Sequence, residues 1–235
     1  VVEDGTSGHR ATMTAPRAAY QHVGLLVICP TVWYTECVNK DVLLKFISEK
    51  GLVRARDLPE QLGVPPASIR PLLRSGQVVR VGRGLYSLAA AEITEHHALA
   101  EACKRVPNGV VCLLSALAFH NIGTQNPPEV WLAIDGKARR PHIDYPALRI
   151  VRFPGPALTA GIQETTVEGV TVRLYSPAKT VADCFKYRNK VGLDVAIEAL
   201  RECLRLRQCR SDVLWEYARI CRVDKVMKPY MEALL

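Results

Sequence analysis

Residues 68–88, SIRPLLRSGQVVRVGRGLYSL, combine a short helical segment with two runs of strand-forming residues. The helical segment spans Ser68–Ser75, and we expect Ser68 to cap it, because a serine side chain can accept a free amide hydrogen of the first turn. Pro71 then falls in that first turn, where a proline is tolerated. The runs Val78–Val81 and Leu85–Leu88, joined by a glycine-containing turn, predict a β-hairpin with a basic tip.

Two helical segments precede this stretch. Asn39 can cap a helix with one apolar face, and Gly51 ends it. Asp57 can cap a second, short helix that runs to Leu62, and a Gly63-Val64 turn leads into the segment at Ser68. A helix, a helix-turn-helix and a basic hairpin in this order predict a winged helix-turn-helix DNA-binding domain over residues 39–90.

The charge of the chain is concentrated in this region. The whole sequence of 235 residues carries a net charge of +8, and residues 39–90 hold nine basic against four acidic residues. Arg70 and Arg74 lie four residues apart, hence on one helical face, opposite the apolar side chains that would pack inward. The expected DNA-binding residues are Arg56, Ser68, Arg70, Arg74, Arg80 and Arg83. Alternatively, a winged helix can serve protein contacts only, and the arginines are then a solvated face.

The rest of the chain divides into an N-terminal extension and a second domain. Residues 1–38 show no clear period and have no predicted role, and the apolar run Val23–Cys29 is too short to span a bilayer. Residues 91–235 predict a larger mixed α+β domain that folds by itself, so the chain is α+β throughout. Helices are expected at 95–105, 111–121, 177–187, 193–208, 212–221 and near the C-terminus, and strands at 130–134, 148–153 and in a hairpin at 165–175.

The eight cysteines include no Cys-x-x-Cys pair, and several lie in apolar helical patterns. This spacing argues against a zinc site and against a disulfide scaffold. Reduced thiols in a cytoplasmic protein are the simpler interpretation. We expect no cofactor, no metal and no membrane partner, and the oligomeric state is left open.

Two patterns could indicate catalysis. Ser176-Pro177-Ala178-Lys179 has the Ser-x-x-Lys spacing of penicillin-binding enzymes, but the companion motifs are absent and a serine followed by proline is a common helix start. The rival hypothesis to a non-enzymatic regulator is a metal-dependent nuclease targeted by the winged helix. Its carboxylates would come from Asp135, Asp144, Glu164 and Asp183.

Between about Val42 and Cys203 the chain resembles the AbiEi family of bacterial antitoxins and transcriptional regulators. The resemblance rests on four stretches, which are Ser75–Tyr86, Leu114–His120, Pro128–Leu132 and Ser176–Asp183. It implies a non-catalytic protein of a type IV toxin-antitoxin system. The N-terminal domain would repress its own operon by binding double-stranded operator DNA, and the C-terminal antitoxin-like domain would counter a cognate nucleotidyltransferase-type toxin.

Overall fold

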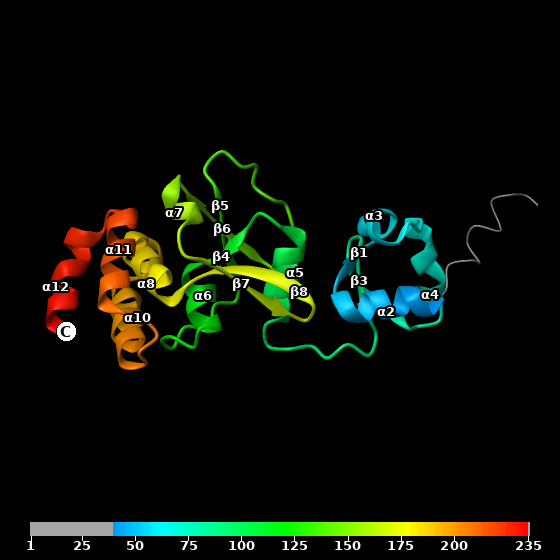
Figure 1. Cartoon of the computed structure of the whole chain (residues 1–235), viewed down its shortest axis with the longest axis horizontal. Helices are drawn as coiled ribbons and strands as arrows, with labels where there is room; N and C mark the ends of the chain where they lie inside the picture. Colours follow the sequence, from blue (N-terminus) through cyan, green and yellow to red (C-terminus); the bar gives the residue numbers. More distant parts are fainter. Residues whose placement is uncertain (1–39, 235) are drawn as a thin grey trace, which may run out of the picture.

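The computed structural model of the chain describes residues 40–234. The predicted cap Asn39 and the predicted extension 1–38 lie outside these residues. The described chain forms two lobes that follow one another in sequence (Figure 1).

The first lobe contains four short helical segments of five residues or fewer, one longer helix and a three-stranded antiparallel sheet of order β1-β3-β2. Its elements are α2 (Lys40–Lys50), β1 (Val53–Arg54), η1 (Ala55–Asp57), α3 (Leu58–Leu62), η2 (Pro66–Ile69), α4 (Arg70–Arg74), β2 (Val78–Gly82) and β3 (Leu85–Leu88). Leu43 and Ile47 of α2 pack with Leu72 of α4 and Val78 of β2 in the centre of the lobe. The predicted helix that ends before Gly51 is confirmed. The predicted β-hairpin is confirmed as well.

Helix α4 starts later than predicted. Helix α4 begins at Arg70, and Ser68 lies two residues earlier, inside the 3₁₀ turn η2. Its side chain is buried and makes no capping hydrogen bond, so the predicted cap is wrong. The reason is Pro66, which occupies the first position of η2 and starts the helical turn before Ser68 is reached. Pro71 lies in the first turn of α4, as predicted.

The second lobe contains a five-stranded mixed sheet of order β6-β5-β4-β8-β7. Its elements are α5 (His97–Arg105), β4 (Val110–Val111), α6 (Leu113–Phe119), β5 (Val130–Asp135), β6 (Leu148–Phe153), α7 (Pro156–Thr159), β7 (Ile162–Val167), β8 (Val170–Tyr175), α8 (Pro177–Lys186), α9 (Arg188–Val191), α10 (Leu193–Arg205), α11 (Ser211–Cys221) and α12 (Asp224–Leu234). The expected α+β class is confirmed. Val111 was expected to start a helix over 111–121, but it lies with Val110 in the central strand, which pairs with β5 on one side and β8 on the other.

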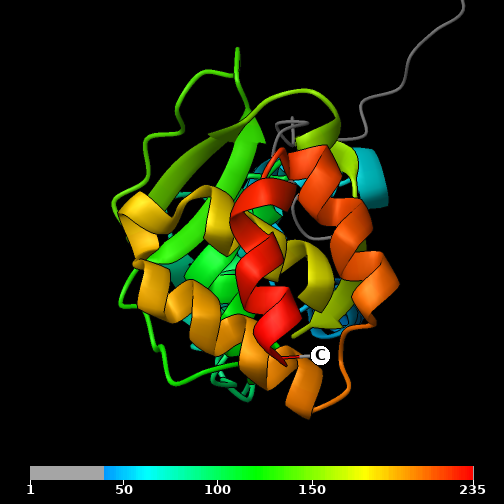
Figure 2. The ribbon, with the colours of Figure 1, turned by 90° about the vertical axis from the view of Figure 1, so that its left-hand side faces the viewer.

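Both faces of this sheet are covered. Along β5, Trp131 and Ala133 face a core built with helices α6, α8, α10, α11 and α12. The alternating residues Leu132 and Ile134 face a second core with α5. Figure 2 shows α10, α11 and α12 in front of the strands, and Figure 1 shows these helices at the end of the molecule far from the first lobe. Successive residues of β5 therefore point into different cores, and both faces of the strand are buried.

The second core also joins the lobes. Leu52 and Leu85 of the first lobe are buried within the same cluster as residues of α5 and β8. Gly51 has φ of +61°, and a Cβ placed on it would overlap the carbonyl oxygen of Glu168, in the turn between β7 and β8. Lys104 Nζ lies 3.9 Å from Asp57 Oδ2 across the same boundary. The lobes are thus in direct contact, and the independent folding of residues 91–235 stays a prediction.

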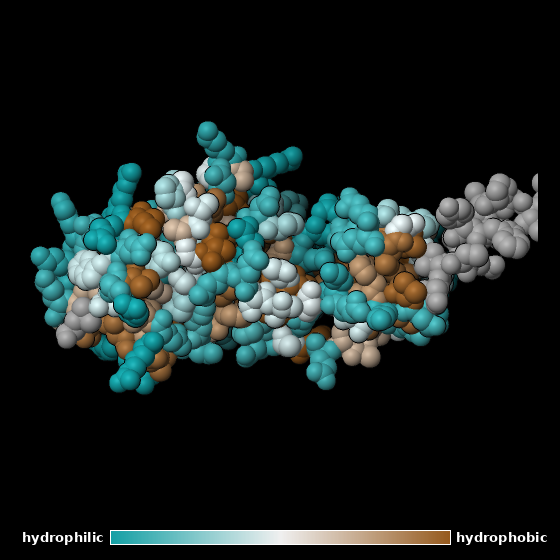
Figure 3. Space-filling view, in the orientation of Figure 1, coloured by the Kyte–Doolittle hydropathy of each residue, from teal (hydrophilic) through white to brown (hydrophobic). Residues whose placement is uncertain are grey.

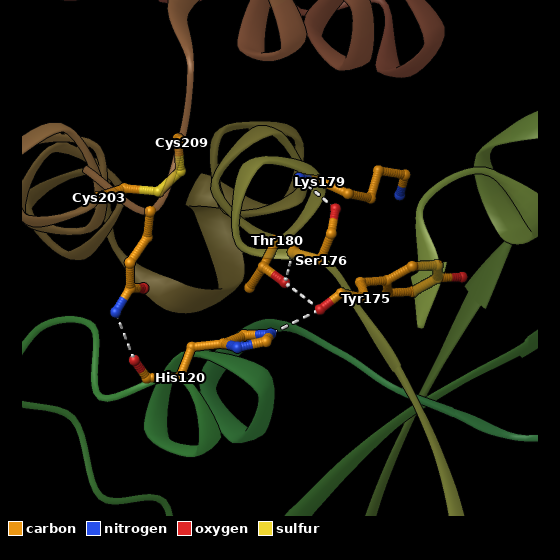
Figure 4. Close-up of a disulfide and its surroundings, with 8 residues drawn as sticks. His120, Tyr175, Ser176, Lys179, Thr180, Cys203 and Cys209 are labelled. Carbon is orange, nitrogen blue, oxygen red and sulfur yellow. Dashed lines mark hydrogen bonds between the residues drawn. A yellow bond between two sulfur atoms is a disulfide. The ribbon is translucent and has the colours of Figure 1, made fainter. Parts of the chain in front are cut away.

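Cys203 and Cys209 form a disulfide between the end of α10 and the loop before α11 (Figure 4). The expectation that the thiols are reduced is wrong for this pair. Helix α10 ends at Arg205 and the chain turns back, which brings the two Cα atoms to 5.5 Å, within the usual range for a disulfide. Four other cysteines, Cys103, Cys112, Cys184 and Cys221, are free and buried.

Among residues 40–234, no helix combines the length and apolarity needed to cross a lipid bilayer.

Candidate nucleic-acid interface

Helix α4 presents two arginines to solvent. Arg70 and Arg74 are exposed, whereas Leu72 between them is buried in the core of the first lobe. Neither arginine forms an ion pair with any residue of the described chain from Lys40 to Leu234. The predicted division of this helix into a basic outer face and an apolar inner face is confirmed.

The β2–β3 hairpin carries two more exposed arginines. Arg80 lies on β2 and donates a hydrogen bond from Nε to the carbonyl oxygen of Gly82, at 3.1 Å. A bulge between Arg80 and Gly82 shifts the register of the hairpin. Gly84 has φ of +69°, a conformation that favours glycine. Arg83 lies at the tip of this tight turn, and it is exposed.

The other two predicted contact residues differ in accessibility. Arg56 is exposed, and its Nε lies 3.7 Å from Asp57 Oδ1. Ser68 is only 6% exposed, so its side chain is not available to a ligand in this conformation. Figure 3 shows hydrophilic residues interspersed with hydrophobic patches on the visible face of both lobes.

Two arginines that the sequence reasoning missed complete a basic cavity. Arg56 and Arg83 line a cavity of about 500 Å³ together with Arg54 of β1 and Arg105 of α5. Burial and the positive charge of Arg56 lower the pKa of Arg54, with Asp57 opposing them. Arg54 ends β1 and Arg56 lies in the 3₁₀ turn η1, so no strand or helix period of the sequence placed them on one face. Arg105 could not be linked to them either, since it lies in the other lobe.

The four carboxylates of the nuclease hypothesis are not assembled into a metal site. Within residues 40–234, no group of three or more histidine, cysteine, aspartate or glutamate side chains is arranged to hold a metal ion. Glu164 lies 3.7 Å from Arg173, and Asp144 is an exposed loop residue 3.9 Å from His142. Asp183 is fully buried in the helical layer.

The Ser-x-x-Lys segment is structural. Ser176 caps α8 by accepting a hydrogen bond from the backbone amide of Lys179, at 3.4 Å, and Pro177 takes the first helical position. The Nζ atom of Lys179 instead contacts both carboxylate oxygens of Asp183, at 2.7 and 2.6 Å. Figure 4 shows the lysine side chain extending away from Ser176 Oγ. The lysine is thus not placed to activate the serine.

One family model matches the first lobe of the chain. Residues 41–89 match the family model described as "Transcriptional regulator, AbiEi antitoxin". This match lies on the lobe that carries α4 and the β2–β3 hairpin, and it supports a role as a regulator or antitoxin. It also confirms the AbiEi resemblance for this segment.

Two further comparisons add no functional assignment. The crystal structure of the RV2827C protein from Mycobacterium tuberculosis is similar to 82% of this chain and 79% of that chain, at 18% identity and a TM-score of 0.47. No curated protein matches the sequence.

Proposed function

We propose that the chain is a sequence-specific transcriptional repressor whose first lobe binds double-stranded DNA as a winged helix-turn-helix. The observation that carries the proposal is the set of exposed arginines on α4 and the β2–β3 hairpin, free of carboxylate partners within residues 40–234, in the segment that matches AbiEi regulators. Exposed guanidinium groups without internal partners are suited to phosphates and to base edges. A repressor acts where the DNA is, so we place the protein in the cytoplasm.

Different contacts are proposed for the two elements. In helix-turn-helix proteins the early residues of the recognition helix meet base edges in the major groove. Arg70 is the first residue of α4, so it is assigned to base recognition. Arg83 at the hairpin tip is assigned to the DNA backbone, because contacts there position the protein without reading sequence.

Arg70→Ala and Arg83→Ala are expected to weaken DNA binding in different ways. Loss of a bidentate arginine–guanine contact costs about 1–3 kcal/mol on the operator and relaxes the preference at one base pair. Loss of a phosphate contact weakens operator and scrambled duplex alike and lowers the slope of log affinity against log salt by about one. A salt titration of both duplexes with the wild type and both variants measures this. Arg219→Ala is the matched control, because it removes an exposed arginine from α11, at the opposite end of the chain.

If all four proteins bind both duplexes with equal affinity at every salt concentration, the helix and hairpin are not a DNA-binding site. The protein-contact alternative would then be favoured.

We propose an antitoxin role for the second lobe, directed at a nucleotidyltransferase-type toxin encoded beside the gene. The family match supports the antitoxin class, and the earlier sequence resemblance supports this toxin type. The full chain is expected to restore growth to cells expressing such a toxin. The double variant Arg70→Ala/Arg83→Ala should restore growth equally well, because neither substitution touches the second lobe's core.

Growth curves with soluble antitoxin verified by immunoblot test this modularity. Continued growth arrest despite soluble wild-type protein would overturn the antitoxin role. Rescue by the wild type but not by the double variant would show that the two roles are inseparable.

A further inference from the structure

The cavity at the boundary between the lobes is lined by arginines from both of them. Arg54, Arg56 and Arg83 come from the first lobe and Arg105 from α5 of the second. The other lining residues, Ala55, Pro66, Gly84, Leu85 and Ile143, are uncharged, so no carboxylate among residues 40–234 lines the cavity. Four guanidinium groups therefore share one concave surface without a lining counter-charge.

The nearby carboxylates offset only part of this charge. Glu101 is fully buried behind Arg105, and its Oε1 accepts hydrogen bonds from Arg105 Nε at 3.0 Å and Nη2 at 2.6 Å. Asp57 lies 3.7 Å from Arg56 and 3.9 Å from Lys104, so its charge is divided between two cations. Within residues 40–234, Arg54 and Arg83 have no ion-pair partner. Burial and then the positive charge of Arg56 lower the pKa of Arg54; Asp57 opposes them, and Arg105 adds a smaller lowering.

The second lobe fixes its arginine against the hairpin. A Cβ placed on Gly82 would overlap Arg105 Nη2, so this guanidinium lies directly against the backbone of β2. The two hydrogen bonds to buried Glu101 hold the guanidinium in that position. Arg105 is therefore preorganised beside the hairpin rather than free to extend into solvent.

The chemistry of the cavity indicates its ligand. Planar guanidinium groups bind phosphate oxygens with paired, charge-assisted hydrogen bonds. A volume of about 500 Å³ is within the usual range of small-molecule pockets. The cavity also includes Arg83 and Gly84 of the hairpin tip, so a phosphate of bound DNA is a second source of the same group.

We infer that this cavity is a binding site for a phosphate group, held by Arg54, Arg56 and Arg83 of the first lobe and Arg105 of the second. Its occupant bridges the two lobes and neutralises their shared positive charge. A bound phosphate would thereby couple the position of the hairpin to the second lobe. The inference holds for a free phosphate compound independently of the proposed repressor role.

The test uses the full chain, with inorganic pyrophosphate and a DNA duplex as separate probes. Calorimetric titration measures pyrophosphate binding, and fluorescence anisotropy measures binding of operator and scrambled duplexes. Arg54→Gln and Arg56→Gln remove charge from the cavity, and Arg219→Gln is the matched control on α11. Thermal unfolding verifies that each variant is folded. If Arg54→Gln does not fold, the result is taken from Arg56→Gln alone, because Arg56 is exposed.

Each cavity variant is expected to weaken pyrophosphate binding by about tenfold or more, because it loses one hydrogen bond to a charged group. Arg219→Gln should bind pyrophosphate as the wild type does. This result supports a free phosphate ligand. Absence of pyrophosphate binding, together with an equal loss of operator and scrambled-duplex affinity in the cavity variants, supports the DNA backbone as the source. If the cavity variants match Arg219→Gln with both probes, the inference is overturned. A wild type that binds pyrophosphate but does not prefer the operator would refute the proposed repressor and leave the phosphate site standing.

Discussion

Lys179→Met is expected to lower the free energy of unfolding by about 3–5 kcal/mol, because it leaves the carboxylate of Asp183 buried without its counter-charge. Both side chains are fully buried, and Lys179 Nζ contacts the two carboxylate oxygens at 2.7 and 2.6 Å. In the described chain, the only other hydrogen bond to the Asp183 carboxylate comes from Cys221 Sγ, at 3.2 Å. Nζ also lies 4.2 Å from the ring centroid of Tyr175, a cation–π contact that the substitution removes. Urea-induced unfolding measures the change.

Two companion variants show whether the loss comes from the unpaired charge. Burial raises the pKa of Asp183 to about 6 although Lys179 opposes it, so keeping this carboxylate charged is itself costly. Lys179→Met/Asp183→Leu should therefore recover most of the lost stability. Lys228→Met removes a lysine with the same i,i+4 spacing, from an exposed pair with Glu232 at 3.7 Å, and should change stability by less than about 1 kcal/mol. Equal losses for Lys179→Met and Lys228→Met would contradict the assignment.

Gly51→Ala is expected to destabilise the protein by about 2–5 kcal/mol, as the sum of a left-handed backbone penalty and an overpacked contact. Gly51 has φ of +61°, and the added Cβ would overlap the carbonyl oxygen of Glu168. The turn at Glu168 cannot yield easily, because its carboxylate binds Thr94 at 2.8 Å and His97 Nδ1 at 2.6 Å. Burial alone would raise the pKa of Glu168, but the hydrogen bonds from His97 and Thr94 outweigh it and lower that pKa. The hydrogen bonds of the charged Glu168 carboxylate thus hold the turn in place.

Gly63→Ala is the matched control for this substitution. Gly63 has φ of +67° but no atom within 4 Å of its added Cβ. Gly63→Ala should therefore lower the free energy of unfolding only by the left-handed backbone penalty, about 1–2 kcal/mol. Thermal and urea unfolding of both variants separate the two contributions. If Gly51→Ala costs no more than Gly63→Ala, the backbones of the two lobes are not in the contact described.

The local elements were predictable where the sequence carries a period or a turn signal. The apolar face of Lys40–Lys50, the Gly82–Gly84 turn and the Glu168–Gly169 turn each follow from the positions of a few side chains. The two-residue strands β1 and β4 were missed, because two residues cannot display an alternation. Both are strands only because neighbouring strands pair with them.

Contacts between distant segments, and local features without a recognised pattern, were not predicted from the sequence. The exposed arginines of α4 and the hairpin follow from local spacing, but the approach of Arg105 to Gly82 is a contact between lobes. The disulfide was missed because Cys203 and Cys209 are six residues apart and match no motif. Their meeting depends on where α10 ends. The cap at Ser68 failed because Pro66 had already started a tighter helical turn.

The most direct test of the central claim is the affinity of the wild-type chain for the DNA upstream of its own gene, compared with a scrambled duplex of the same length. Both are measured by fluorescence anisotropy at the same near-physiological salt concentration, because affinities at different salt cannot be compared. A sequence-specific repressor is expected to bind the upstream DNA at least about 10³-fold more tightly than the scrambled duplex. Equal affinity for the two duplexes would contradict the account.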